Sequence, residues 1–174
     1  FFIDPLEKLN IKKDSPLMMA LSFQSLGADC YILFEKDFFI TNHAKPNLEM
    51  YKFEGKFKED GCYLESFNVT KSLTKEVTPN DIIHMRIDPP YDTRYQRYLW
   101  MLDFIQNQVG CEVLNSPLKI MKYNEKLVAY KDLSHSIHSF VGSSVSAFEK
   151  FIKDVKREGV TDLILKPLDL YSGI

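Results

Sequence analysis

The sequence has 174 residues, a formal net charge of -2 at pH 7 and 45% hydrophobic residues. This fits one globular domain, or one domain with part of a second, with a core large enough to fold unaided. The near-neutral charge argues against a nucleic-acid binder. No stretch reaches the ~20 apolar residues that span a bilayer, and no signal peptide is visible. We therefore expect a cytoplasmic protein without membrane association, whose three widely spaced cysteines are free thiols.

Both ends of the sequence resemble interrupted elements. The opening "FFIDP" has the pattern of the second half of a strand, and "LILKPLDLYSGI" closes the sequence just after another apolar segment. These patterns predict that the sequence is a piece of a longer protein.

The first elements alternate between strand and helix. Pro5 ends the opening strand, and Ser15 followed by Pro16 predicts a helix with Ser15 as its N-cap. Gly27 is the expected end of that helix. The predicted strands of this part are residues 1–4 and 29–35.

Residues 37–77 differ from the flanking segments in their pattern, because aromatic and polar residues alternate. Gly55 and the pair Asp60-Gly61 are typical turn residues. The segment therefore predicts antiparallel hairpins with one face in water.

The strand and helix alternation then resumes. Gly110 ends the predicted helix 92–108, Pro117 begins a short helix, and Ser143 or Ser144 caps a later amphipathic helix. The remaining predicted elements are strands 81–87, 111–116, 135–142 and 161–166 and a helical stretch 124–133. Together the elements predict a mostly parallel open α/β sheet up to about residue 118, followed by the beginning of a second α/β unit.

Polar residues gather where the parallel strands end. Ligands of such sheets bind beyond the C-terminal ends of the strands, where Asp4 and the segment 86–92 are expected. Arg86 can hold a carboxylate or a phosphate through two hydrogen bonds, and Ser15 adds a helix N-terminus that favours anions. The alternative is that Arg86 forms a salt bridge with Asp88 or Asp92.

Two lysines are further candidates. Lys166 ends an apolar strand pattern, where an ammonium group is costly unless it reaches water or an anion. Lys126 lies in a helical stretch, where a solvated side chain is the simpler interpretation. His135 and His138 have a spacing that makes metal chelation improbable in a strand, and no P-loop, GxGxxG, GxSxG or HExxH motif is present.

Five motifs taken together resemble the bacterial glutathione synthetases, which belong to the ATP-grasp ligases. They are, in order, "DPLEKLNIKKDSP", "MRIDPPYDTRY", "VLNSP", "NEKL" and "LILKPLD". The resemblance runs through the chain and is weakest at 37–77 and 131–160. It implies a Rossmann-like pre-ATP-grasp substrate domain at 1–120 and an incomplete ATP-grasp domain at 121–174.

The resemblance also implies an activity. The family joins γ-glutamylcysteine to glycine through an acyl phosphate, with ATP and Mg²⁺, and tends to form homo-oligomers. The implied substrate-binding residues are Ser15, Arg86 and Asp88. The implied ATP-binding residues are Lys126, Lys166, Ser172 and Gly173, while the ligands of Mg²⁺ are expected downstream of this sequence.

The sequence departs from the family pattern near its end. The glycine-rich loop that closes over the phosphates corresponds here to residues 170–173, with a single glycine, and bulky residues limit positive φ angles. Because of this departure, and because the ligands of Mg²⁺ are expected downstream, we expect no ligase activity from this piece alone. Two alternatives remain, a ligase with another acceptor and a non-catalytic ATP-grasp protein that binds nucleotide or peptide.

Overall fold

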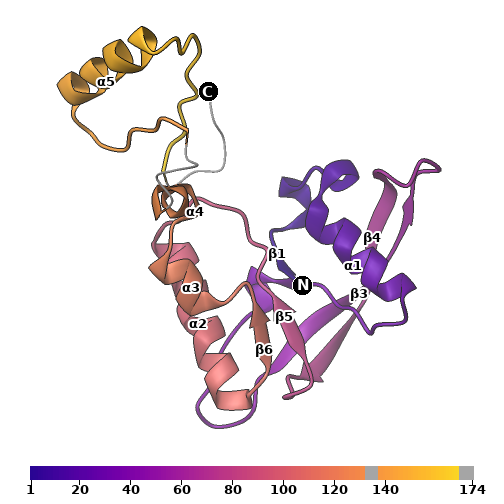
Figure 1. Cartoon of the computed structure of the whole chain (residues 1–174). Coiled ribbons are helices and arrows are strands. Elements are labelled where there is room, and N and C mark those ends of the chain that lie inside the picture. Colours follow the sequence, from indigo (N-terminus) through magenta and orange to yellow (C-terminus); the bar gives the residue numbers. More distant parts are fainter. Residues whose placement is uncertain (132–136, 169–174) are drawn as a thin grey trace. The chain divides into compact units, whose positions relative to one another are not determined.

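The structure, a computed structural model, describes residues 1–131 and 137–168 (Figure 1). The chain divides into two compact units, Phe1–Lys122 and Tyr123–Ile174. The first unit contains β1 (Phe2–Ile3), α1 (Ser15–Ser25), β2 (Leu33–Phe34), β3 (Asn47–Phe57), β4 (Leu64–Glu76), β5 (Ile82–His84), α2 (Thr93–Val109), β6 (Glu112–Leu114) and α3 (Pro117–Lys122). The 3-10 turns η1 (Leu6–Lys8), η2 (Ile11–Lys13) and η3 (Glu35–Asp37) complete it.

The strands of the first unit form one short, partly parallel array. β1 pairs with β2 and β5 pairs with β6, both in parallel, while β3 and β4 are antiparallel. Single bridges connect these pairs, in parallel between Phe2 and Met85 and antiparallel between Ile32 and Tyr51. The resulting order is β4-β3-β2-β1-β5-β6, which agrees with the predicted α/β class.

The segment predicted as several hairpins is one long antiparallel pair, β3 and β4. Gly61, with φ of +69°, lies in the turn between them, as expected. Gly55 is not a turn residue. It lies within β3, where a Cβ atom would come within 2.9 Å of the carbonyl oxygen of Ser66. The glycine is therefore required by close approach to the neighbouring strand rather than by a turn.

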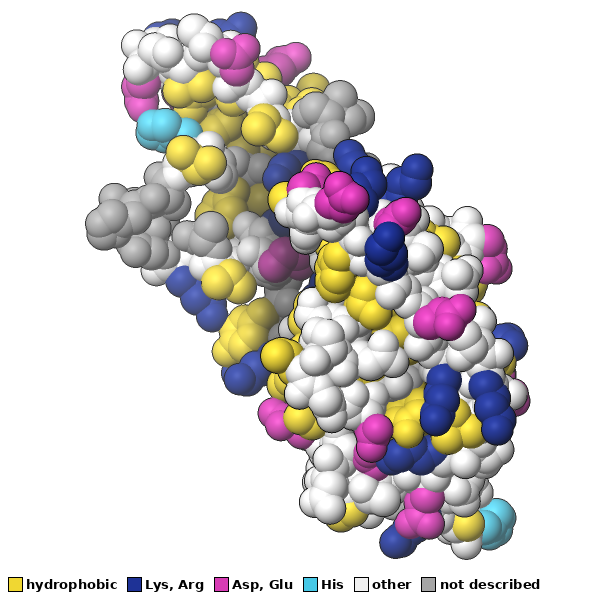
Figure 2. Space-filling model, turned by 90° about the vertical axis from the view of Figure 1, so that its right-hand side faces the viewer, with side chains coloured by type: hydrophobic (Ala, Val, Ile, Leu, Met, Phe, Trp, Pro, Cys, Tyr) yellow, Lys and Arg dark blue, Asp and Glu magenta, His cyan; other side chains and the backbone are white. Residues whose placement is uncertain are grey.

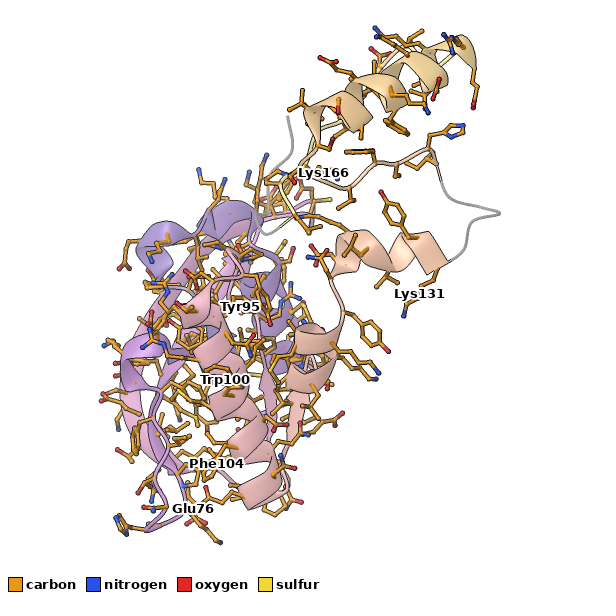
Figure 3. The ribbon with its side chains drawn as sticks, turned by 90° about the vertical axis from the view of Figure 1, so that its left-hand side faces the viewer. Glu76, Tyr95, Trp100, Phe104, Lys131 and Lys166 are labelled. Carbon is orange, nitrogen blue, oxygen red and sulfur yellow. The ribbon has the colours of Figure 1, made fainter. Side chains whose placement is uncertain are left out.

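Two apolar clusters cover the two faces of the sheet. Successive side chains of a strand point to opposite faces, and accordingly Phe2 belongs to the cluster under α2 whereas Ile3 belongs to the cluster under α1. The two helices lie on opposite sides of the strands (Figure 1). The outer face of α2 stays exposed at Trp100 and Phe104 (Figure 3).

The helix ends follow local capping chemistry. The Asp14 carboxylate accepts a hydrogen bond from the Leu17 amide at 2.9 Å, so Asp14 is the N-cap of α1. The prediction of Ser15 is therefore wrong by one residue, because an aspartate caps as well as a serine and here its carboxylate reaches the free amide. For α2, Asp92 caps the N-terminus and Gly110, with φ of +83°, follows the C-terminus.

The second unit contains α4 (Glu125–Val128), η4 (Ala129–Lys131) and α5 (Val145–Arg157). The Ser144 hydroxyl accepts a hydrogen bond from the Ala147 amide at 3.3 Å, which confirms one of the two predicted caps. The Phe140 ring packs against Phe148 and Phe151, with ring centroids 5.5 and 5.7 Å apart.

The predicted strand 161–166 is wrong, and the described part of the predicted strand 135–142 is also not a strand. Residues 132–136 lie outside the described range. A strand needs a hydrogen-bonded neighbour, and no such partner occurs among residues 137–168. Ile164 is accordingly 76% exposed, and apolar side chains are visible on the surface of the part that holds α5 (Figure 2). Across the described ranges, no helix has the length and apolar character needed to cross a membrane.

Candidate functional site

A polar pocket of about 290 Å³ lies in the first unit. It joins the loops and turns after β1, the N-terminus of α1 and the segment after β5. Its lining residues are Lys8, Leu9, Asn10, Lys13, Asp14, Ser15, Pro16, Arg86 and Asp88. The three substrate-binding residues implied by the sequence are thus on one surface, although they come from segments about seventy residues apart.

The topology of the sheet brings these segments together. β1 and β5 are neighbours, and the Arg86 amide donates to the Phe2 carbonyl at 2.8 Å. Both strands therefore end at the same edge, where the Asp88 amide donates to a carboxylate oxygen of Asp4 at 2.8 Å. This hydrogen bond holds the loop after β5 against the loop after β1. The polar edge expected from the parallel strands is present.

The Arg86 side chain lines the pocket with unused hydrogen-bonding capacity. Its Nε atom is buried and has no hydrogen-bond partner. Within the described ranges Arg86 forms no ion pair at 4.0 Å or less, so the predicted salt bridge to Asp88 or Asp92 is wrong. Asp92 instead caps α2 by accepting from the Tyr95 amide at 2.9 Å. A buried guanidinium donor without an acceptor is costly unless a ligand supplies one.

The two aspartates of the pocket titrate above their ordinary range. Burial is the largest cause that raises the pKa of Asp14, opposed by the Leu17 amide and by Arg86. Burial also raises the pKa of Asp88, and the nearby Asp4 carboxylate adds to the rise. The pocket therefore combines one arginine with carboxylates that repel one another.

Two lysines and an asparagine complete the lining, and the sequence reasoning assigned no role to them or to Asp14. Lys8 and Lys13 are exposed, and the Lys13 ammonium lies 5.6 Å from the centroid of the Tyr63 ring. The position of these residues in the sequence could have identified them as part of the site. The segment that holds these residues follows β1, so it must lie at the same sheet edge as the segment after β5.

In the second unit, Lys126 joins two segments of the chain. Its ammonium donates to the carbonyl oxygens of Pro167 and Leu168 at 2.7 and 3.1 Å, and its side chain is 23% exposed. The Asn124 side chain also donates to the Leu168 carbonyl, at 3.1 Å. The interpretation of Lys126 as a solvated surface lysine is therefore wrong. The "NEKL" and "KPL" motifs lie in contact.

Lys166 differs from its predicted environment. It is exposed on the segment after α5 and not at the end of a buried strand (Figure 3), because no strand in the described part of the chain pairs with that segment. The other two implied ATP-binding residues, Ser172 and Gly173, lie outside the described residues, as does His135. The Nε2 atom of His138 lies 2.9 Å from a carboxylate oxygen of Glu158.

Comparison with known proteins adds two findings. The model of the prokaryotic glutathione synthetase N-terminal domain matches residues 1–120. Glutathione synthetases of Wigglesworthia glossinidia brevipalpis, Vibrio parahaemolyticus and Escherichia coli are 28%, 30% and 28% identical to the chain, covering 98% of it and 50%, 51% and 51% of the respective relatives. The chain thus spans about half the length of these curated relatives. Since the family model covers most of the chain, the chain belongs to the prokaryotic glutathione synthetase N-terminal domain family.

Proposed function

We propose that the chain is the N-terminal portion of a cytoplasmic ATP-grasp ligase that joins γ-glutamylcysteine to glycine. Its family and the name of its relatives support glutathione formation. We assign residues 1–120 to the substrate domain and 121–174 to the beginning of the ATP-grasp domain. The observation that carries the proposal is Arg86, whose side chain lines a pocket at the C-terminal edge of β1 and β5 and whose buried Nε atom has no acceptor.

Arg86 binds a carboxylate of the peptide substrate in this proposal. A guanidinium group offers parallel N–H donors that match the two oxygens of a carboxylate. Such a ligand would supply an anionic partner for the Arg86 side chain, which lines the pocket. Ser15 lines the same pocket at the first turn of α1, where its hydroxyl and the positive end of the helix dipole favour an anion. Asp88 holds the loop that carries Arg86 through its backbone hydrogen bond to Asp4.

Nucleotide binding is assigned to the second unit. Lys126 is fixed by two carbonyl oxygens of the segment that follows Lys166, so the two implied ATP-binding lysines come from adjoining segments. Ammonium groups fit the phosphates of ATP, which supplies the phosphoryl group that activates the substrate carboxylate. These two lysines would hold the phosphates in place. The described residues contain no group of three or more metal-ligating side chains suited to Mg²⁺, so no step is assigned to that ion.

Calorimetric titration of the chain with dipeptides tests this proposal. We expect γ-glutamylcysteine to bind, and its isomer with an ordinary α-peptide linkage to bind at least about tenfold more weakly, because a shifted linkage moves the carboxylate away from Arg86. Equal binding of many dipeptides would favour a ligase with another substrate. No binding of γ-glutamylcysteine would contradict the proposal.

A second assay separates the chain from the complete ligase. With ATP, Mg²⁺, glycine and γ-glutamylcysteine, we expect no glutathione from the chain alone, because it spans about half the length of the glutathione synthetases that it matches and its segment 170–173 has a single glycine. Glutathione formation that depends on ATP and glycine would show that the chain is catalytically sufficient.

A further inference from the structure

Asn124 connects two segments of the second unit through both ends of its side-chain amide. Its Oδ1 atom accepts a hydrogen bond from the Lys126 amide at 2.9 Å, and its Nδ2 atom donates to the Leu168 carbonyl at 3.1 Å. The acceptor end therefore serves the segment that follows Asn124, and the donor end serves a residue 44 positions away. The family resemblance implied roles for Lys126 and Lys166 but none for Asn124.

The local contact is that of a helix N-cap. The carbonyl of Asn124 accepts from the amides of Leu127 and Val128 at 3.0 and 3.1 Å, while its side chain accepts from the Lys126 amide. Asparagine is among the best residues for this role, because its side-chain oxygen satisfies an amide that the helix leaves without a partner. Since α4 has only four residues, it is not stable by itself, and the cap fixes the start of the turn that carries Lys126.

The distant contact shares its acceptor with Lys126. The Leu168 carbonyl accepts from the Asn124 side chain and from the Lys126 ammonium, in both cases at 3.1 Å. The Pro167 carbonyl accepts from the same ammonium at 2.7 Å. A carbonyl oxygen has two lone pairs and can accept two hydrogen bonds at once. Asn124 therefore holds the Leu168 carbonyl where the Lys126 ammonium reaches it.

These hydrogen bonds also bear on Lys166. No strand in the described part of the chain pairs with residues 161–166, and Ile164 is accordingly exposed. Lys166 lies two residues before Leu168, whose carbonyl Asn124 holds. The contact therefore limits how far Lys166 can move from Lys126.

We propose that Asn124 is a positioning residue, which sets the spacing between the two lysines assigned to the nucleotide without contacting the nucleotide itself. This inference rests on the proposed function. Two ammonium groups repel one another, so presenting both to the same phosphates requires that their segments be held together. A neutral amide suits this task. Aspartate would cap α4 equally well, but its carboxylate would compete with phosphate for the Lys126 ammonium and could not donate to the Leu168 carbonyl.

Two variants separate the local contact from the distant one. Asn124→Ser keeps an N-cap oxygen but is too short to reach the Leu168 carbonyl, and Asn124→Asp keeps the cap and the length but loses the donor. The matched control is Asn107→Ser in α2, the same substitution at an exposed asparagine that donates to a carbonyl of its own helix. ATP binding to the whole chain is measured from amide shifts in NMR titrations. Circular dichroism checks that the variants keep their helix content.

We expect Asn124→Ser to weaken ATP binding about three- to tenfold, the loss typical of one neutral hydrogen bond. Asn124→Asp should weaken it about tenfold or more, because it adds a negative charge near Lys126 and the phosphates. Asn107→Ser should leave it unchanged. Without ATP, Asn124→Ser should also shift the amides of Lys166 and Leu168.

A double-mutant cycle distinguishes positioning from general support of the fold. The spacing between two lysines matters only when both are present. Added to Lys126→Ala, Asn124→Ser should therefore weaken ATP binding by about twofold or less.

Normal ATP affinity of Asn124→Ser, or an equal loss in both backgrounds, would overturn the inference and leave the proposed function intact. Unshifted amides at Lys166 and Leu168 would overturn it as well, whatever the affinity of Lys126→Ala. Absence of ATP binding to the wild-type chain would overturn the assignment of the second unit to the nucleotide, and this inference with it.

Discussion

Similar apolar sequence patterns are buried in the first unit, where a neighbouring strand covers them, and exposed in the described part of the second unit. In Phe1–Lys122, every short apolar strand pairs with another, and residues on both sheet faces are buried. In the described part of Tyr123–Ile174, Val155 is the one buried hydrophobic residue, and the apolar segment around Ile164 is exposed. The first unit therefore has a preformed pocket on a packed scaffold. The described part of the second unit has helices and the contact that Lys126 makes with the carbonyls of Pro167 and Leu168.

The two units should differ most in how much unfolding free energy is lost when an apolar side chain is shortened. Leu102 in α2 is fully buried, so Leu102→Ala should cost about 2–5 kcal/mol of unfolding free energy. The matched control, Ile164→Ala, should change it by less than about 0.5 kcal/mol because that side chain is exposed. Urea denaturation followed by circular dichroism, to which the helices of both units contribute, measures both. Equal losses would mean that the second unit is as well packed as the first.

The next largest effect should be on the affinity for the peptide ligand, which we assign to the first unit. Arg86→Ala should weaken γ-glutamylcysteine binding about 30- to 150-fold, since a charged hydrogen-bonded contact contributes about 2–3 kcal/mol. Arg97→Ala, on the exposed face of α2, should leave it unchanged. Arg86→Lys keeps the charge but not the paired donors, and should still lose most of the affinity. Calorimetry with all three variants checks this, and a normal affinity for Arg86→Ala would exclude the carboxylate contact.

The helix caps provide a smaller contrast. Asp14→Ala should lower the unfolding free energy of the first unit by about 1 kcal/mol, because α1 packs through buried Leu17 and Leu21. Ser144→Ala removes the corresponding cap of α5, whose packing is slight, and should reduce helix content without shifting the main unfolding transition. Circular dichroism and urea denaturation distinguish the two results. If Ser144→Ala shifted the main unfolding transition, the expectation that only the cap of α1 affects that transition would be wrong.

The smallest expected effect concerns pH. The pKa of Asp88 is raised from 3.8, so its ionised form opposes folding above the raised pKa, and this opposition disappears as the pH falls through that pKa toward 3.8. Asp88→Asn should thus stabilise the first unit at neutral pH by at most about 0.5 kcal/mol, and by less in acid. The pKa of Asp92 is lowered by the Tyr95 amide, so Asp92→Asn should have the opposite sign. Thermal unfolding measured as a function of pH checks this. Destabilisation of the first unit by Asp88→Asn at neutral pH would contradict the prediction.

Much of the first unit could be predicted because its cues are local. Asp92 and Gly110 delimit α2 through capping chemistry, and the alternation of Phe2 and Ile3 between two cores follows from strand geometry. The polar edge followed from the rule for parallel strands. The one-residue error at α1 arose because Asp14 and Ser15 are equally good caps, and only the folded geometry shows whose oxygen reaches the Leu17 amide.

The remaining errors concern contacts between distant segments. The apolar pattern at 161–166 resembles a strand, but hydrogen bonding requires a partner that the described residues do not provide. Lys126 appears solvated in isolation, whereas its acceptors are the carbonyls of Pro167 and Leu168, about forty residues away. The state of Arg86 likewise depended on Asp92, whose carboxylate is engaged in capping α2.

NMR can locate the binding sites of both ligands on the chain. Backbone amide shifts are followed while γ-glutamylcysteine, and separately ATP, is added. We expect the peptide to shift amides at 8–15 and 86–88, and ATP to shift those around Lys126 and Lys166. Peptide-induced shifts confined to 123–168, with none around Arg86, would contradict this expectation.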